Sequence, residues 1–80
     1  MKKSYPYNSD YADAYGCAIN WYLKKSGLPY DTTAYGFQIF NGNSDSSVIL
    51  DDNGIHVDGD EKLHDIVKKA IAEVEEDKYM

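Results

Sequence analysis

The chain of 80 residues contains no arginine: its eight basic residues are all lysines, set against fourteen aspartates and glutamates. Direct recognition of nucleic acid usually rests on cations that displace counterions from phosphates and on arginine side chains that read base edges. A chain with a net charge of −6 and no arginine is poorly suited to either task. We therefore expect no direct binding to nucleic acid, and we expect the acidic surface to favour a partner with a basic surface.

Cys17 is the only cysteine, so the chain cannot form an internal disulfide bond. Its position beside Ala18 in a helical segment predicts a small buried side chain rather than a reactive thiol. The first residues, MKKSYPY, contain no apolar run and no cleavage signal, and no later segment is apolar enough to cross a bilayer. These features predict an intracellular, cytoplasmic protein without membrane contact.

Motifs for catalysis and cofactor binding are missing as well. The six glycines form no phosphate-binding loop, and a cysteine in the middle of a helix lacks the activated setting of a nucleophile. Carboxylates are numerous, but on a solvated surface they titrate normally and are not tuned acids or bases. We expect a protein that is not an enzyme and that holds no cofactor.

Imidazole and carboxylate groups in the second half of the chain have the chemistry of zinc ligands. The residues concerned are His56, Asp58, Asp60 and His64. Their spacing is better explained by a surface pair between Asp51 and His56 on neighbouring strands, with His64 solvated on a helix. The acid-rich stretches DDNG and VDGDE lack the spacing of a calcium-binding loop. We therefore predict no metal site.

Residues 9–25, SDYADAYGCAINWYLKK, have the pattern of a helix with aromatic side chains around much of its circumference, and Gly27 predicts its end. The apolar arc spans roughly 200°, which is wider than the stripe of about 100° that one-sided packing requires. The excess is either covered by residues 1–8 together with the loop 28–32, or it forms a docking surface. The candidate anchors for a partner are Tyr11, Tyr15, Trp21 and Tyr22.

Residues 33–40 alternate between two faces, as half-buried strands do, and residues 47–51, SVILD, form a second predicted strand. Residues 53–54, Asn-Gly, predict a two-residue hairpin turn that leads into a third strand and places Leu50 opposite Val57. The three strands form an antiparallel meander with one apolar face and one solvated face. The solvated face carries Gln38, Ile49, Asp51, His56 and Asp58.

Apolar residues recur from Leu63 to Val74 at spacings of three and four, which predicts a second helix that begins after Asp60. The sequence thus indicates the α+β class and a single small domain over residues 9–80, with element order α-β-β-β-α. We expect the helices to pack on the apolar face of the three-stranded antiparallel meander. Residues 1–8 are expected to form a flexible N-terminal arm.

The net charge is concentrated in the C-terminal part, since residues 1–50 carry no net charge and residues 51–80 carry −6. These carboxylates are either ordinary solvated groups or a negative surface that imitates a nucleic-acid duplex and binds a basic partner. The acids that we assign to partner binding are Asp51, Asp52, Asp58, Asp60, Glu61, Asp65, Glu73 and Glu76, and the same surface extends to Glu75 and Asp77.

Small size, acidity and the aromatic helix together predict a non-enzymatic interaction protein that inhibits a larger protein by occluding its basic surface. In size and acidity the chain resembles small phage-encoded inhibitors of host defence nucleases, including anti-CRISPR proteins; the likeness is one of composition and covers no defined stretch. It implies a nucleic-acid-handling target from phage defence and a location in the host cell of a phage. The alternative is a homo-oligomeric accessory or structural protein that self-associates through the aromatic N-terminal helix.

Overall fold

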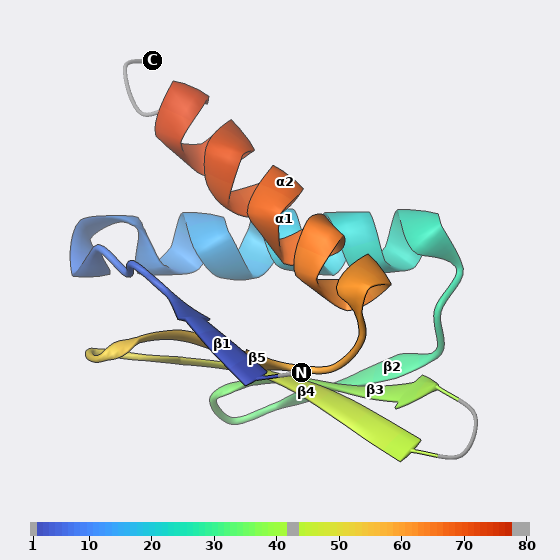
Figure 1. Cartoon of the computed structure of the whole chain (residues 1–80). Coiled ribbons are helices and arrows are strands. Elements are labelled where there is room, and N and C mark those ends of the chain that lie inside the picture. Colours follow the sequence, from blue (N-terminus) through green and yellow to red (C-terminus); the bar gives the residue numbers. More distant parts are fainter. Residues whose placement is uncertain (1, 42–43, 78–80) are drawn as a thin grey trace.

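Two helices lie on one face of a five-stranded antiparallel sheet in the computed structural model, which describes residues 2–41 and 44–77 (Figure 1). The strand order across the sheet is β1-β5-β4-β3-β2. The predicted α+β class is confirmed, but the sheet has two more strands than the predicted meander. Along the chain the elements are β1 (Lys2–Tyr5), the 3-10 helix η1 (Ser9–Tyr11), α1 (Ala12–Ser26), β2 (Tyr30–Thr33), β3 (Gly36–Asn41), β4 (Ser44–Asp51), β5 (Gly54–Asp58) and α2 (Glu61–Asp77).

Both unpredicted strands are edge strands. β1 occupies half of the predicted flexible arm and pairs with β5, from Lys2 opposite Asp58 to Tyr5 opposite Ile55. β2 falls mainly in the predicted loop 28–32 and pairs with β3. Each strand is only four residues long and mostly exposed, so neither shows the apolar alternation that marks a strand in a sequence. The predicted order α-β-β-β-α is therefore wrong, and the observed order is β-α-β-β-β-β-α.

The hairpin between β4 and β5 turns one residue earlier than predicted. Asp51 pairs with Gly54, so the two central turn residues are Asp52 and Asn53. The Asn53 N–H donates a hydrogen bond to the Asp51 carboxylate (2.8 Å), a contact by which aspartate often stabilises a turn. The register moves by two residues relative to the prediction. Because two is an even number, the apolar side chains stay on the predicted face.

Side-chain and glycine caps determine where the helices begin and end. The Asn8 side chain accepts a hydrogen bond from the Asp10 N–H (3.0 Å) at the start of η1. Gly27, with a φ of +80°, ends α1 as predicted, and Asp60 caps α2 by accepting from the Leu63 N–H (3.0 Å). α1 thereby connects the two edges of the sheet, from β1 to β2. Neither helix of the described part has the length and apolar character that a membrane span requires.

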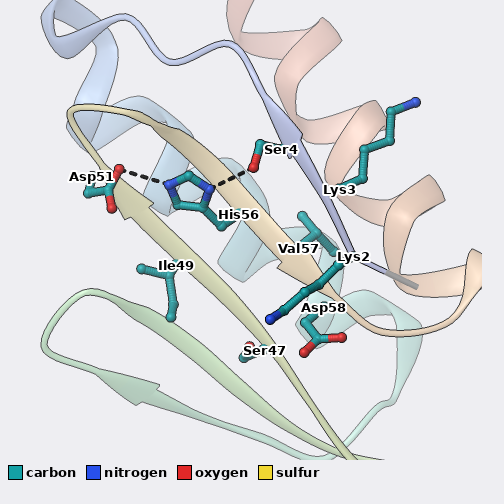
Figure 2. Close-up of a pocket in the computed structure, with 9 residues that line it drawn as sticks. All are labelled: Lys2, Lys3, Ser4, Ser47, Ile49, Asp51, His56, Val57 and Asp58. Atoms are coloured by element: carbon teal, nitrogen blue, oxygen red, sulfur yellow. Dashed lines mark hydrogen bonds and ion pairs between the residues drawn. The ribbon is translucent and has the colours of Figure 1, made fainter.

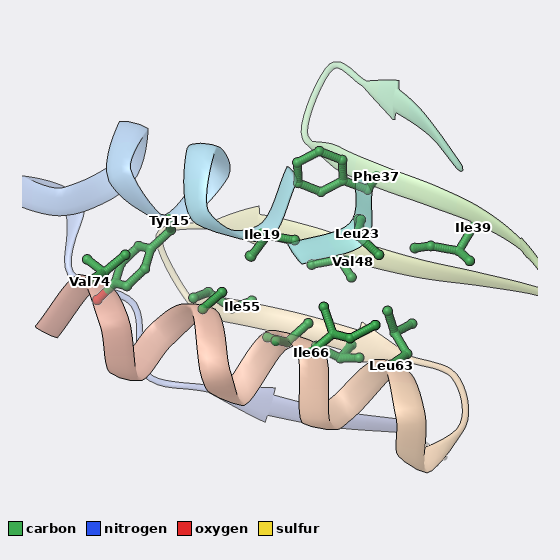
Figure 3. Close-up of a cluster of buried hydrophobic side chains, with 13 residues drawn as sticks. Tyr15, Ile19, Leu23, Phe37, Ile39, Val48, Ile55, Leu63, Ile66 and Val74 are labelled. Atoms are coloured by element: carbon green, nitrogen blue, oxygen red, sulfur yellow. The ribbon is translucent and has the colours of Figure 1, made fainter. Parts of the chain in front are cut away.

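The core lies between the helices and the sheet (Figure 3). The apolar arc of α1 is largely internal, because Tyr15 is only 2% exposed and the Tyr7 ring packs on it with 5.7 Å between centroids. On the β2 side, the Tyr30 hydroxyl donates to the Asn20 side chain (2.6 Å). The sheet and α2 thus bury this side of α1, and Tyr7 from the segment before the helix packs on Tyr15. The other core residues are Ile19, Leu23, Phe37, Ile39, Val48, Ile55, Val57, Leu63, Ile66, Val67, Ala70 and Val74.

Candidate functional site

No helix or loop of the described residues covers the face of the sheet opposite the helices, and we call this face the open face (Figure 1). Side chains alternate between the two faces along each strand, so the strand registers align the outward residues in rows across the sheet. One row is Lys2, Asp58, Ser47, Gln38 and Asp31, and the next is Ser4, His56, Ile49, Gly36 and Thr33. Asp51 lies beyond the second row, and Phe40 and Asp45 lie beyond the first.

A chain of hydrogen bonds joins three strands on this face (Figure 2). Ser4 Oγ lies 2.7 Å from His56 Nδ1, and His56 Nε2 lies 2.9 Å from Asp51 Oδ1. The predicted contact between Asp51 and His56 is present, although the two residues are diagonal neighbours in the register. The hydrogen bond from His56, followed by that from the Asn53 N–H, lowers the pKa of Asp51 because both favour the ionised carboxylate. Asp51 therefore adds a negative charge to the open face.

Serine, histidine and aspartate also form the catalytic triads of hydrolases, but this network is solvated. Ser4 and Asp51 are exposed and His56 is half-buried. They border a shallow depression of about 610 Å³ on the open face. Catalysis by such a network depends on preorganised groups in a site that excludes water. The network ties the edge strand β1 to the hairpin of β4 and β5.

The open face combines acidic side chains with exposed apolar ones. Its aspartates are Asp31, Asp45, Asp51 and Asp58, and among the described residues Lys2 is its one lysine. Ile49 is 43% exposed near the centre, and Phe40 is exposed towards one end. Beside Ile49 lies Gly36, where an added Cβ would stand 1.9 Å from the carbonyl oxygen of Val48. The face therefore carries negative groups around the apolar side chain of Ile49.

The acids that the sequence analysis assigned to partner binding are distributed over separate places. Lysines 62, 68 and 69 stand among the acids of α2 in the sequence. Asp31 and Asp45 complete the acidic open face and were missed, because one belongs to an unpredicted strand and the other precedes the predicted one. Asp51 and Asp52 lie at the hairpin, Asp58 on the open face, Asp60, Glu61 and Asp65 at the start of α2, and Glu73, Glu75 and Glu76 near its end; the side chain of Asp77 lies outside the described part.

The aromatic candidates on α1 differ in accessibility. Tyr15 belongs to the core, and Tyr11 and Tyr22 pack against it half-buried. A hydrogen bond with Glu73, together with burial, raises the pKa of Tyr22. Trp21 is 52% exposed, and its ring contacts that of Tyr22 edge-on with 5.1 Å between centroids. Of these four side chains, Trp21 offers the largest surface to a partner.

Cys17 lies on the outer side of α1 and is exposed, so the prediction that it is buried is wrong. α1 buries Tyr15, Ile19 and Leu23 at spacings of four residues. At about 100° per residue, Cys17 points roughly 200° away from both Tyr15 and Ile19. The position of Cys17 on the helix, and not the hydrophobicity of its side chain, thus determines its exposure.

His56 and His64 are not brought together. His56 lies on the open face. His64 lies on α2, on the opposite side of the sheet, and is buried, with its Nδ1 2.8 Å from the Tyr5 hydroxyl. The prediction that His64 is solvated is therefore wrong, because β1 covers this side of α2. Burial, and then the charge of Asp65, raises the pKa of Tyr5. Within residues 2–41 and 44–77, no three His, Cys, Asp or Glu side chains are grouped so as to hold a metal ion.

No protein-family model matches the chain, and comparisons with curated proteins and with solved structures give no significant match. The open face and the outer side of α1 are then the surfaces from which a function can be inferred.

The ionised form of Asp51 should stabilise the fold. Because its folded-state pKa is lowered below 3.8, this stabilisation is present above that pH and is lost as the pH falls through the folded-state pKa. Asp51→Asn should therefore lower the free energy of unfolding at pH 6, and the difference from the wild type should vanish towards pH 2. Urea unfolding at several pH values measures both quantities. The exposed turn neighbour Asp52→Asn is the control; a deficit of Asp51→Asn that does not change with pH would contradict the linkage.

Proposed function

We propose that this chain is a small non-enzymatic binding protein that occludes a basic surface of a larger protein through its open face. The observation that carries the proposal is an uncovered sheet face on which four aspartates lie around the exposed side chain of Ile49, with the exposed Phe40 beside Asp45. Apolar contacts at the centre and polar groups at the rim are typical of protein interfaces. A negative rim would in addition speed the encounter with a basic partner.

The area of the open face is smaller than that of a standard protein interface, so a stable contact would use all of it. Five strands spaced about 4.8 Å apart, with a longest strand of about 26 Å, give a flat area of roughly 500 Å². A stable protein interface buries about 800 Å² on each partner. The contact therefore has to extend beyond the strands. A contact of this area would block the corresponding surface of the larger protein.

A change of charge at constant fold tests the proposal. The probe is an amphipathic Lys/Leu peptide of about 18 residues, which is roughly 27 Å long as a helix. The open-face variant Asp31→Asn, Asp45→Asn, Asp58→Asn should bind it about tenfold more weakly and with a smaller salt dependence, since each exposed charge contributes about 0.5 kcal/mol. Titration calorimetry at several salt concentrations measures both quantities.

The matched control removes three charges elsewhere, as Asp13→Asn, Glu75→Gln, Glu76→Gln. This variant has the same net charge as the open-face variant and should bind the peptide nearly as well as the wild type. Equal weakening in the two variants would show that the acids act only through the total charge of the protein.

The exposed ring of Trp21 favours a second candidate function, in which the chain self-associates through the outer side of α1. Sedimentation equilibrium distinguishes it from the first. A mass that rises with concentration, and returns to that of a monomer in Trp21→Ala, would favour a homo-oligomeric accessory protein. A monomer in both forms would leave the open face as the contact surface.

A further inference from the structure

Both edges of the sheet are protected against the addition of a strand. β1 carries Lys2 and Lys3 and is followed by Pro6. β2 has only four residues and is preceded by Pro29. Lysines, prolines and short strands at an edge are features that oppose pairing with another chain. Binding of a partner as an additional strand is therefore disfavoured, and we expect the partner to bind the open face.

The open face has the dimensions to seat a helix along its central strands. A helix is about 10–12 Å wide with its side chains. Asp58 on β5 and Asp31 on β2 stand in the same row, three strand spacings apart, which is roughly 14 Å. β3 and β4 run between them, with Gly36 as a position without a side chain next to Ile49. A helix above β3 and β4 would thus have a carboxylate on each side.

The remaining aspartates match the length of such a helix. Asp45 and Asp51 lie six residues apart on β4, or roughly 20 Å at about 3.4 Å per residue. This distance corresponds to about 13 residues of helix. Ile49 lies between the two aspartates, and Phe40 lies opposite Asp45 on the neighbouring strand. Apolar side chains on one stripe of the helix would face Ile49 and Phe40, and basic side chains on its flanks would reach the aspartates.

We propose, on the basis of the proposed function, that the segment of the partner seated on the open face is an α-helix with an apolar stripe flanked by lysine or arginine side chains. The helix lies along β3 and β4. Its long basic side chains reach the carboxylates beside the strands while their aliphatic stems cover the apolar centre.

Two peptides of identical Lys/Leu composition test the proposal against the full ¹⁵N-labelled chain. In one peptide the leucines follow the helical period, and in the other they alternate with lysine as in a strand. The helical peptide should bind at least tenfold more tightly and become more helical by circular dichroism. It should also shift the amide signals of Ser47, Ile49 and Phe40 more than those of α1.

Two variants locate the contact. Ile49→Ala should weaken binding of the helical peptide about fivefold, and Trp21→Ala, which also shortens an exposed apolar side chain, should leave it unchanged. Thermal unfolding confirms that both variants are folded. Equal or tighter binding of the alternating peptide on the open face would overturn the helical partner and leave the proposed function standing. If neither peptide shifts the signals of the open face, the proposed function fails as well.

Discussion

Replacing Ile19 by alanine is expected to lower the free energy of unfolding by about 2–5 kcal/mol. Ile19 is 0% exposed in the middle of α1 and belongs to the core between the helices and the sheet. The substitution removes three side-chain carbons and leaves a cavity that the surrounding residues fill only in part. Domains are stable by only about 5–15 kcal/mol, so the loss is a large fraction of the total. Urea unfolding at neutral pH measures it.

The same substitution at Ile49 is the matched control. Ile49 is 43% exposed on the open face, so its truncation should lower the free energy of unfolding by no more than about 1 kcal/mol, the range of strand propensities. Both substitutions remove the same atoms, and propensity acts against the expected difference, because alanine is favoured in a helix and disfavoured in a strand; a larger loss at Ile19 therefore reports burial. Similar losses in both would mean that the open face is covered, either by another part of the chain or by a second copy.

The elements that were predictable from the sequence are those that bury a regular pattern of side chains. α2 repeats apolar residues with helical spacing from Leu63 to Val74, and the structure places it at Glu61–Asp77 with Asp60 as its cap. The alternation in β3, together with the hairpin signal at residues 53–54, likewise indicated which side chains face the core. These patterns are local, and they depend only on the period of a helix or a strand.

The edge strands were not predictable because their stability comes from contacts that are distant in the sequence. β1 has the polar sequence Lys-Lys-Ser-Tyr and forms because the backbone of β5 offers hydrogen-bonding partners. Its attachment involves Tyr5 and His64, which are 59 positions apart. Nothing in residues 1–8 indicates these partners, and the segment was therefore predicted to be a flexible arm.

The candidate site was also predictable only where local sequence patterns determine it. The outward positions of Ile49, Asp51, His56 and Asp58 follow from alternation and were predicted as one solvated face. Asp31 was assigned to a loop, so its place on the open face became apparent only from the pairing of β2 with β3. For the aromatic residues of α1 the sequence left open whether the rings are covered or exposed. Tyrosine suits half-buried positions, and the Tyr7 ring that packs on Tyr15 comes from a segment outside the helix.

Gly36→Ala is expected to destabilise the domain by about 3 kcal/mol, at the upper end of the range for overpacked positions. A Cβ at this position would stand 1.9 Å from the carbonyl oxygen of Val48 and 3.1 Å from Cα of Ile49. Because these are backbone atoms of the adjacent strand β4, they cannot move aside as a flexible side chain would. β3 would have to separate from β4, in the centre of the sheet. Thermal unfolding should show a decrease in Tm of more than about 10 °C for a domain of this size.

Gly16→Ala, the matched control, should have the opposite effect. Gly16 lies within α1, and no heavy atom outside the local helix backbone stands within 4 Å of the position of an added Cβ. Alanine is favoured over glycine inside a helix by about 0.5–1 kcal/mol, because the unfolded chain loses less conformational freedom. Tm should therefore rise by a few degrees. The same methyl group thus stabilises the protein where space surrounds it and destabilises it where β3 and β4 approach closely, and an unchanged or higher Tm in Gly36→Ala would contradict the pairing of β3 with β4 described above.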